Sequence, residues 1–244
     1  MNMDPTLTSS LSLQAYTKKM FFSTLATVAM AVTGAIATPA ASPFDLMRRQ
    51  GITPNSVGTH DGYFYSWWSD GASPVTYTNL AGGSYSVQWQ SGGNLVGGKG
   101  WNPGSAKNIT YSGTWTPVNN GNAYLTIYGW TRNPLVEYYI VENFGEYNPG
   151  NSATPKGTVQ TSEGTYNLFQ STRVQQPSIE GTSTFNQYWA IRADKRTGGT
   201  VDTGVFFDAW EKAGMPMGTH DYMVVATEAY RSAGNSHITV ESPP

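Results

Sequence analysis

Cysteine is absent from the 244 residues of this chain. Without a thiol, the protein can form neither a disulfide framework nor a thiolate metal site, and it has no cysteine nucleophile. Its stability must therefore come from the burial of apolar side chains. A domain of about 200 residues is large enough to bury a core of the size that this requires.

Charged side chains are scarce. They make up 12% of the residues and leave a formal net charge of −2, whereas about 25% charged residues is usual. No basic stripe is present, which argues against nucleic acid as a partner. Glycine, with 27 residues, and aromatic residues, with 13%, are plentiful instead. This composition is typical of a secreted all-β protein that acts on neutral polymers.

Histidine is rare as well, and the three residues, His60, His220 and His237, lie far apart in the sequence. Metal sites built on histidine use short, regular spacings between their ligands, and no such spacing occurs here. We therefore expect surface histidines, no metal site and no cofactor.

A long apolar run lies near the N-terminus. Lys18 and Lys19 precede an apolar stretch over residues 21–37 that ends in the small-residue pattern Ala-Ile-Ala, and these are the parts of a signal peptide. A membrane anchor is the alternative, but the run is short for a spanning helix and is diluted by threonine. We expect residues 1–37 to be a signal peptide with an N-terminal extension. The protein is then secreted, extracellular and free of the membrane after signal removal.

Residues 38–49 are expected to be a short propeptide, because they end at the dibasic pair Arg48-Arg49. No linker divides the chain after this point, so residues 50–244 are expected to form a single catalytic domain. Short alternating segments are separated there by turn residues about every 8–12 positions, which indicates a sandwich or barrel. Residues 173–180 contain Pro177, and we expect them to form a protruding loop between strands.

One segment has the pattern of a helix, from Gly204 to Ala213. Asp202 or Thr203 can cap its start, and Gly214 can end it. Apolar residues recur at helical spacing along it, which predicts a helix packed on a sheet. The predicted fold class is therefore all-β, with two sheets and one short helix.

Two strand-like runs each place one glutamate among tyrosines. The first is PLVEYYIVENFGEYNP, from Pro134 to Pro149, and the second is YMVVATEAY, from Tyr222 to Tyr230. Successive side chains of a strand point to opposite faces. Glu137 therefore shares a face with Tyr139, and Glu228 shares a face with the tyrosines at the two ends of its run. A carboxylate in such a run is expensive to bury unless it is paired or used.

A pair of carboxyl groups can hydrolyse a glycosidic bond. Retaining enzymes hold two of them about 5–5.5 Å apart, one to attack the anomeric carbon and one to protonate the leaving oxygen. The two roles need different protonation states, so burial and the ionised partner must raise the pKa of the acid. A single strand glutamate is more often a surface or salt-bridged group than a catalytic one. A second glutamate in a matching context favours the pair Glu137 and Glu228.

Six motifs carry a resemblance to a known family. They are YFYSWWSDG, YTN, NLVGGKGW, YGWTRNPLVEYYIVENFGEYNP, RVQQPSIEGTSTFNQYW and DYMVVATEAY. With them, residues 55–242 resemble a fungal endo-1,4-β-xylanase of glycoside hydrolase family 11. The resemblance implies a two-sheet β-jelly roll with a deep cleft, xylan and xylo-oligosaccharides as substrates, and a monomer.

The resemblance also implies roles for single residues. Glu137 matches the family nucleophile, and Glu228 matches the general acid/base. Arg173 is equally well explained as a brace of the hairpin that the family calls the thumb. The positions that match substrate-binding residues are Trp68, Asn94, Asn122, Tyr124, Tyr128, Tyr139, Arg173, Pro177, Gln187 and Tyr222.

The departures from the family pattern are small. Ala229 follows the acid/base where many members have glycine, Trp67 replaces a more usual tyrosine, and Glu180 in the thumb is more often uncharged. Two other functions remain open at this point, an endo-β-glucanase on a related jelly roll and a non-catalytic carbohydrate-binding jelly roll. A further role as an elicitor on plant cells is tested by none of these residues.

Overall fold

The computed structural model describes residues 51–118 and 121–244. The predicted signal peptide and propeptide therefore lie outside the described residues. Within the described residues, no helix is both long enough and apolar enough to span a bilayer.

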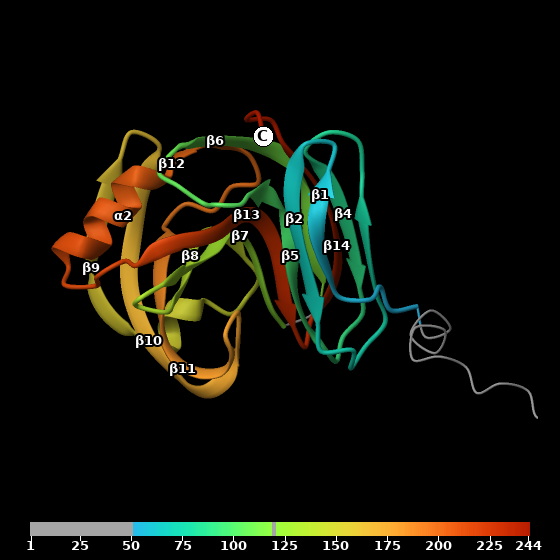
Figure 1. Cartoon of the computed structure of the whole chain (residues 1–244), viewed down its shortest axis with the longest axis horizontal. Helices are drawn as coiled ribbons and strands as arrows, with labels where there is room; N and C mark the ends of the chain where they lie inside the picture. The colour runs from blue at the N-terminus through green and yellow to red at the C-terminus, as the bar shows by residue number, and fades with distance from the viewer. Residues whose placement is uncertain (1–50, 119–120) are drawn as a thin grey trace, which may run out of the picture. The chain divides into compact units, whose positions relative to one another are not determined.

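Two sheets make up the domain (Figure 1). In spatial order, the nine-stranded sheet holds β1 (Ser56–His60), β2 (Tyr63–Ser69), β5 (Asn94–Trp101), β13 (Thr219–Tyr230), β7 (Asn122–Arg132), β8 (Val136–Phe144), β11 (Gly181–Arg192), β10 (Gly164–Ser178) and β9 (Thr154–Thr161). The five-stranded sheet holds β12 (Gly199–Asp202), β6 (Asn108–Val118), β14 (Ala233–Val240), β4 (Ser84–Trp89) and β3 (Val75–Asn79). A short 3-10 helix, η1 (Pro149–Ser152), and one α-helix, α2 (Thr203–Lys212), complete the described chain. The predicted fold class is confirmed.

The main core contains side chains from both sheets. Strand β4 shows how the sequence makes it, because Tyr85, Val87 and Trp89 are buried while Gln88 between them is exposed. This is the alternation of a strand with one apolar and one polar face. A second cluster of buried side chains, largely aromatic, gathers tyrosines and tryptophans from β7, β8, β11 and β13. This second cluster is called the aromatic face below.

Glycines in β5 let its backbone come close to β13, at the centre of the large sheet. A Cβ on Gly98 would lie 1.8 Å from the carbonyl oxygen of Val225, and one on Gly100 would lie 2.2 Å from that of Met223. No side chain fits at either position. The glycine-rich motif therefore serves an approach of backbone to backbone.

Helix α2 confirms the predicted helix with a shift of one residue. Asp202 is the cap, because its side chain accepts a hydrogen bond from the backbone N–H of Gly204, as a cap residue does. Gly214 follows the helix with a φ of 73°, a conformation that favours glycine. Phe206 and Trp210 are buried beneath the helix, in the main core.

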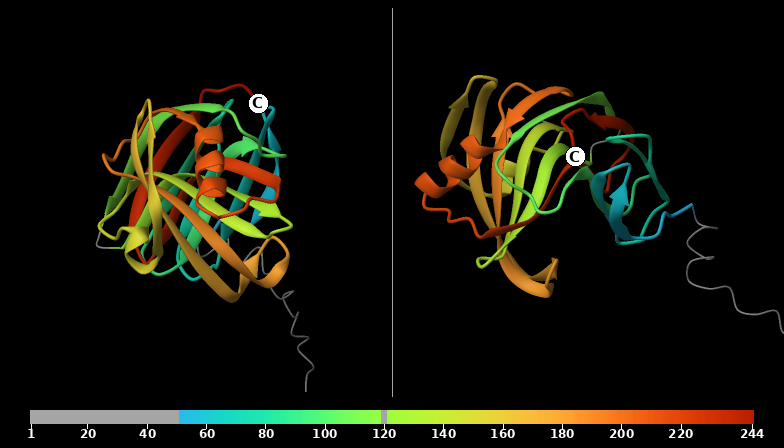
Figure 2. Two further views of the ribbon diagram at one scale, coloured as in Figure 1. Left: turned by 90° about the vertical axis from the view of Figure 1, so that its left-hand side faces the viewer. Right: turned by 45° about the horizontal axis from the view of Figure 1, so that its top comes forward.

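The predicted loop over residues 173–180 is wrong. Strands β10 and β11 continue through it as a long hairpin that turns only at Ile179 and Glu180. The pairing register shifts between Arg173 and Gln176, and Gln175 has a φ of 50°. Such a bulge bends a strand, and the far end of this hairpin curves in both Figure 1 and Figure 2.

Candidate active site

The two glutamates singled out from the sequence lie on the same face of the large sheet. Glu137 of β8 is opposite Trp130 of β7, and Glu228 of β13 is opposite Tyr124 of β7. Trp130 and Tyr124 are separated by an even number of positions on one strand, so they share a face. Both carboxyls therefore rise from the aromatic face. Glu137 is buried and Glu228 is half-buried.

Register places further predicted residues on this face. Trp68 of β2 is opposite Val96 of β5, and Val96 is opposite Glu228. Trp68 is half-buried, whereas its neighbour Trp67 is fully buried in the core. Strand alternation thus turns Trp68 toward the carboxyls and Trp67 away from them.

Two asparagines lie on the strands that flank β13, two residues beyond the position of Glu228. Asn94 of β5 and Asn122 of β7 both lie opposite Tyr230 of β13, two residues beyond Glu228. Both asparagines are half-buried. Within the described chain, the Oδ1 atom of Asn122 and the Oε2 atom of Glu228 have no protein hydrogen-bond partner. Both atoms are buried, so each is a polar atom whose hydrogen-bonding capacity the protein leaves unused.

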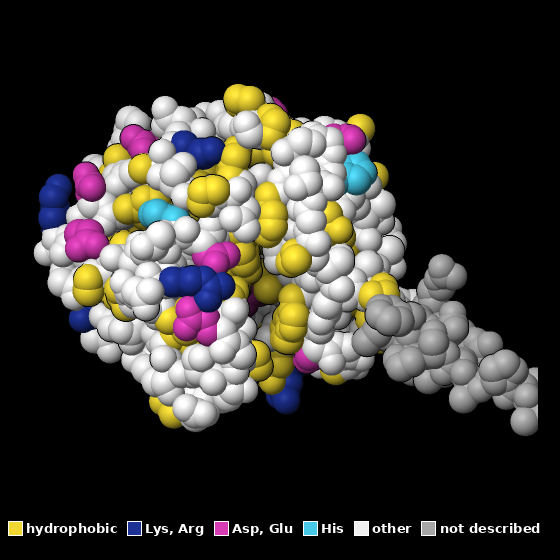
Figure 3. All heavy atoms as spheres, viewed as in Figure 1, with side chains coloured by type: hydrophobic (Ala, Val, Ile, Leu, Met, Phe, Trp, Pro, Cys, Tyr) yellow, Lys and Arg dark blue, Asp and Glu magenta, His cyan; other side chains and the backbone are white. Residues whose placement is uncertain are grey.

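Four tyrosines that were predicted to bind substrate lie on the aromatic face, and together they are called the tyrosine-lined floor of the site. Tyr128 and Tyr139 lie opposite each other with ring centroids 5.1 Å apart. Tyr222 is 6.1 Å from Tyr128, and Tyr124 is 6.5 Å from Tyr139. All four are buried. Figure 3 shows a hollow lined with hydrophobic side chains on one face of the molecule.

Each oxygen of Glu137 ends a chain of hydrogen bonds. On one side, the Trp130 indole N–H donates to the Tyr128 hydroxyl over 2.7 Å, and that hydroxyl donates to Oε1 of Glu137 over 2.8 Å. On the other side, the Gln187 amide donates to Oε2 over 2.7 Å. Donors on both oxygens stabilise the ionised carboxylate and fix its orientation.

The chain on the Gln187 side continues further. Ser171 donates to Oε1 of Gln187 over 3.1 Å, and the Trp189 indole N–H donates to Ser171 over 3.0 Å. Sequence reasoning missed Trp130, Ser171 and Trp189. Their signal is weak, because it depends on the register of β7 against β8, of β11 against β8 and of β10 against β11.

Burial raises the pKa of both carboxyls. For Glu137 the shift is opposed by hydrogen bonds from Gln187, Tyr128 and Tyr139, so its pKa rises less. The pKa of Glu228 rises well above its usual range, first through burial and then through the negative charge of Glu137. Hydrogen bonding by the Tyr139 hydroxyl lowers the pKa of both carboxyls. The pair therefore favours an ionised Glu137 beside a protonated Glu228.

This raised pKa predicts a pH-dependent cost in stability. The native state holds the Glu228 proton to a higher pH than the unfolded chain does, so stability falls as the pH rises from the unfolded pKa to the folded pKa. Glu228→Gln removes this cost. At pH 8 we expect the Tm of the variant to exceed that of the parent by about 2–4 °C for each kcal/mol of stability recovered. At pH 3 the two proteins should have the same Tm.

Thermal unfolding by circular dichroism at the two pH values measures this difference. Asp208→Asn is the control, because it removes a carboxylate from an exposed position on α2. A Tm that rises equally at pH 3 and pH 8, or equally in the control, would contradict the assignment of the cost to burial of Glu228.

Arg173 and Pro177 lie on the β10–β11 hairpin and are exposed. Arg173 lowers the pKa of both Glu137 and Glu228 through its positive charge, so its guanidinium lies within electrostatic range of the pair. It also donates to the Gln176 side chain over 3.3 Å. The structure thus supports a position near the carboxyls and a bracing contact within the hairpin.

The histidines lie apart from this site. His237 is exposed, and the half-buried His60 has its Nδ1 atom 3.1 Å from Nζ of Lys99. His220 departs from the expected surface position, because its ring packs 4.5 Å from that of Phe207 under α2. In the part of the chain that the structure describes, no group of three or more His, Asp or Glu side chains could hold a metal ion.

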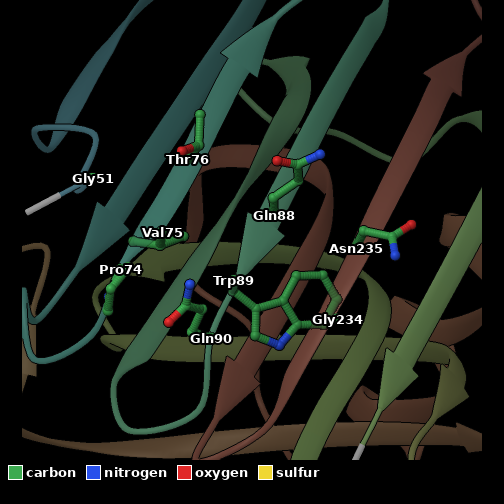
Figure 4. Close-up of a pocket in the computed structure, with 9 residues that line it drawn as sticks. All are labelled: Gly51, Pro74, Val75, Thr76, Gln88, Trp89, Gln90, Gly234 and Asn235. Atoms are coloured by element: carbon green, nitrogen blue, oxygen red, sulfur yellow. The ribbon is translucent and has the colours of Figure 1, made fainter.

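A separate hollow lies on the small sheet (Figure 4). Thr76 of β3, Gln88 of β4 and Asn235 of β14 contribute to its lining and are paired across adjacent strands. No acidic side chain lines it. The hollow therefore cannot supply the carboxyl pair that hydrolysis requires.

A jelly roll with two carboxyls of unequal pKa among buried tyrosines has the fold and site of a glycoside hydrolase. Residues 60–239 match the family model described as Glycosyl hydrolases family 11. The chain belongs to this family, and it is a glycoside hydrolase, as the resemblance predicted. The alternative of a non-catalytic binding module is not favoured.

Several known proteins are similar over most of their length. Ethylene-inducing xylanase 4 of Verticillium dahliae is 69% identical over 223 residues, which are 91% of this chain and 99% of that protein. Endo-1,4-beta-xylanase 1 of Pyricularia grisea is 66% identical over 229 residues, covering 91% and 98% of the two chains. A solved endo-1,4-beta-xylanase of Trichoderma reesei aligns with a TM-score of 0.67 and 37% identity, over 77% of this chain and 100% of that one.

Proposed function

We propose that this protein is a secreted endo-1,4-β-xylanase that hydrolyses internal β-1,4 bonds of xylan and retains the anomeric configuration. Family membership and the names of the relatives support the substrate. The observation that carries the mechanism is the pair itself. Glu137 and Glu228 rise from one face of the large sheet, opposite Trp130 and Tyr124 of the same strand, and the pKa of Glu228 is raised further than that of Glu137.

In the first step, the ionised Glu137 attacks the anomeric carbon while Glu228 gives its proton to the leaving oxygen. The donors Tyr128 and Gln187 hold the Glu137 carboxylate in one orientation, which keeps the attacking oxygen in place. A covalent glycosyl ester on Glu137 results.

The second step uses the same pair with the proton reversed. Once Glu137 is esterified, its negative charge is gone, and with it one of the causes that raise the pKa of Glu228. Glu228, now ionised, takes a proton from a water molecule that attacks the ester. The release of the ester restores the charge on Glu137, which raises the pKa of Glu228 again.

The tyrosines suit a xylose unit. Its ring offers C–H faces to aromatic rings and hydroxyl groups to phenols, and tyrosine provides both contacts. In this proposal Trp68 stacks on a sugar beside Glu228, and Asn94 and Asn122 hydrogen-bond to the same chain; the register of their strands with β13 supports these roles. Xylose lacks the hydroxymethyl group of glucose, so a narrow cleft can accept xylan and exclude glucan.

We also propose that the protein is exported from the cell and that its N-terminal segments are removed. Residues 1–37 are the signal peptide with its extension, residues 38–49 are a propeptide, and residues 50–244 are the mature monomeric enzyme. N-terminal sequencing of protein from the culture medium is expected to start near Gln50. Gel filtration of this form should give the mass of one chain, and a start within residues 1–37 would contradict the signal peptide.

Product analysis tests the activity itself. We expect reducing sugar to be released from unsubstituted xylan at least about tenfold faster than from carboxymethylcellulose. Proton NMR of early products should show the β-anomer first, because two inversions restore the configuration. A preference for the glucan would make the protein an endo-β-glucanase, and an α-anomer at early times would exclude double displacement.

A further inference from the structure

Arg132 joins two parts of the molecule at the end of β7. Its Nε donates to Oδ2 of Asp221 over 2.7 Å, and one terminal nitrogen donates to Oε1 of Glu180, also over 2.7 Å. Asp221 lies on β13, the strand that carries Glu228, and Glu180 lies at the turn of the β10–β11 hairpin. The guanidinium of Arg132 thus bridges the tip of the hairpin, Ile179 and Glu180, to β13, the strand of the predicted acid/base.

The tip does not need Arg132 for its own shape. The Ser178 hydroxyl donates to the carbonyl of Gly181 over 2.7 Å and accepts from the backbone N–H of Glu180 over 3.0 Å. These bonds close the turn locally, in the manner of a serine turn. The ionic bridge therefore sets where the tip lies relative to the sheet.

The same tip has an apolar anchor and a bend behind it. Ile179 packs against the aromatic face, the cluster that includes Tyr128 and Tyr222. The bulge between Arg173 and Gln176 interrupts the pairing of the two strands before the tip. Strand β11 pairs with β8 only from Asn186 onward, so no strand pairing joins the segment beyond the bulge to the rest of the sheet, and a single ion pair can shift its position.

We propose that Arg132 is a positioning residue that holds the tip of the β10–β11 hairpin over the tyrosine-lined floor by bridging Glu180 to Asp221. The role in substrate binding rests on the proposed function. The bridge keeps the tip closed on a bound sugar chain, and its loss weakens substrate binding with little effect on the chemical step. Glu180, which departs from the family pattern, gives this chain an electrostatic attachment at that point.

Glu180→Gln tests the bridge. In 10 mM salt we expect its KM for xylohexaose to be about 1.5- to 5-fold above that of the parent, the range that an exposed ion pair supports, with kcat changed less than twofold. In 1 M salt the Debye length falls to about 3 Å. The KM of the parent should then rise to that of the variant, whose own KM should not change with salt.

Glu163→Gln is a matched control. Glu163 also pairs with an arginine, Arg196, over 3.1 Å, and its side chain is 45% exposed, compared with 39% for Glu180. In each case the arginine keeps a second carboxylate, Glu142 or Asp221. The control removes the same charge from a hairpin turn between β9 and β10. We expect it to have the KM of the parent at both salt concentrations.

A spin label gives a readout that does not depend on activity. The chain has no cysteine, so Thr182→Cys creates a single labelling site at an exposed position beside the tip. We expect the label to become more mobile when Glu180→Gln is added and to be unaffected by Glu163→Gln. Unchanged mobility, an unchanged KM in low salt, or an equal rise of KM in the control would overturn the proposal. If the parent does not hydrolyse xylan, the proposed function fails while the label still tests the bridge.

Discussion

Replacing Glu137 by glutamine is expected to lower kcat on xylan by about 10⁴-fold or more, the scale seen when a hydrolase loses its nucleophile. Glutamine keeps the size of the side chain but cannot attack the anomeric carbon. Initial rates of reducing-sugar release measure the loss. Glu163→Gln, which removes a carboxylate outside the site, should retain the parent rate.

The two glutamates should be distinguishable by their products. Glu228→Ala is expected to lower kcat on xylan by about 10²- to 10⁴-fold. It should lower kcat much less on an aryl xylobioside, because the leaving group of that substrate needs no proton. Azide should then restore turnover with a retained configuration. For Glu137→Gly, azide should attack from the opposite side and give an inverted product. If the two stereochemical outcomes are exchanged, the roles assigned to the two residues are wrong.

A second large effect is expected at a carboxylate that the reaction does not use. Glu142 lies on β8 but faces the main core, where it is 1% exposed. It accepts hydrogen bonds from Tyr111 over 3.0 Å and from Tyr166, and Arg196 contacts it over 2.5 Å. Arg196→Met leaves this buried charge without its cation. We expect a loss of about 3–5 kcal/mol in the free energy of unfolding.

Thermal or denaturant unfolding measures this loss. Arg132→Met is the control, because Arg132 also pairs with two carboxylates but its side chain is 40% exposed, so we expect a much smaller loss of stability than for Arg196→Met. Adding Glu142→Gln to Arg196→Met should recover part of the stability, because no uncompensated charge remains. A double variant no more stable than Arg196→Met would contradict this explanation.

Much of the site could be predicted because strand alternation is a local rule. Alternation is sufficient to place Glu137 beside Tyr139 on one face, and to turn Glu142 toward the other. The approach of Glu137 to Glu228 could not be derived in this way. Their partners on β7, Trp130 and Tyr124, lie well apart along that strand, and alternation along a strand does not reveal how closely two such positions approach each other across a twisted sheet.

The error at residues 173–180 has a physical reason. Proline usually disrupts a strand because it lacks an N–H group. Strand β10, however, pairs with β9 only as far as Gln170. Beyond that residue one edge of β10 is free, and Pro177 can lie in the strand. Whether an edge is free depends on the length of a neighbouring strand, which local sequence does not reveal.

The order of strands in the large sheet has a consequence for biosynthesis. Strand β13 lies between β5 and β7, both of which leave the ribosome before it. Until Tyr230 has emerged, the nascent chain carries two unpaired inner edges, which are templates for aggregation. The large sheet therefore cannot finish folding before Tyr230 has left the ribosome. We expect a chaperone that binds extended chains to protect the polypeptide until its translation is almost finished.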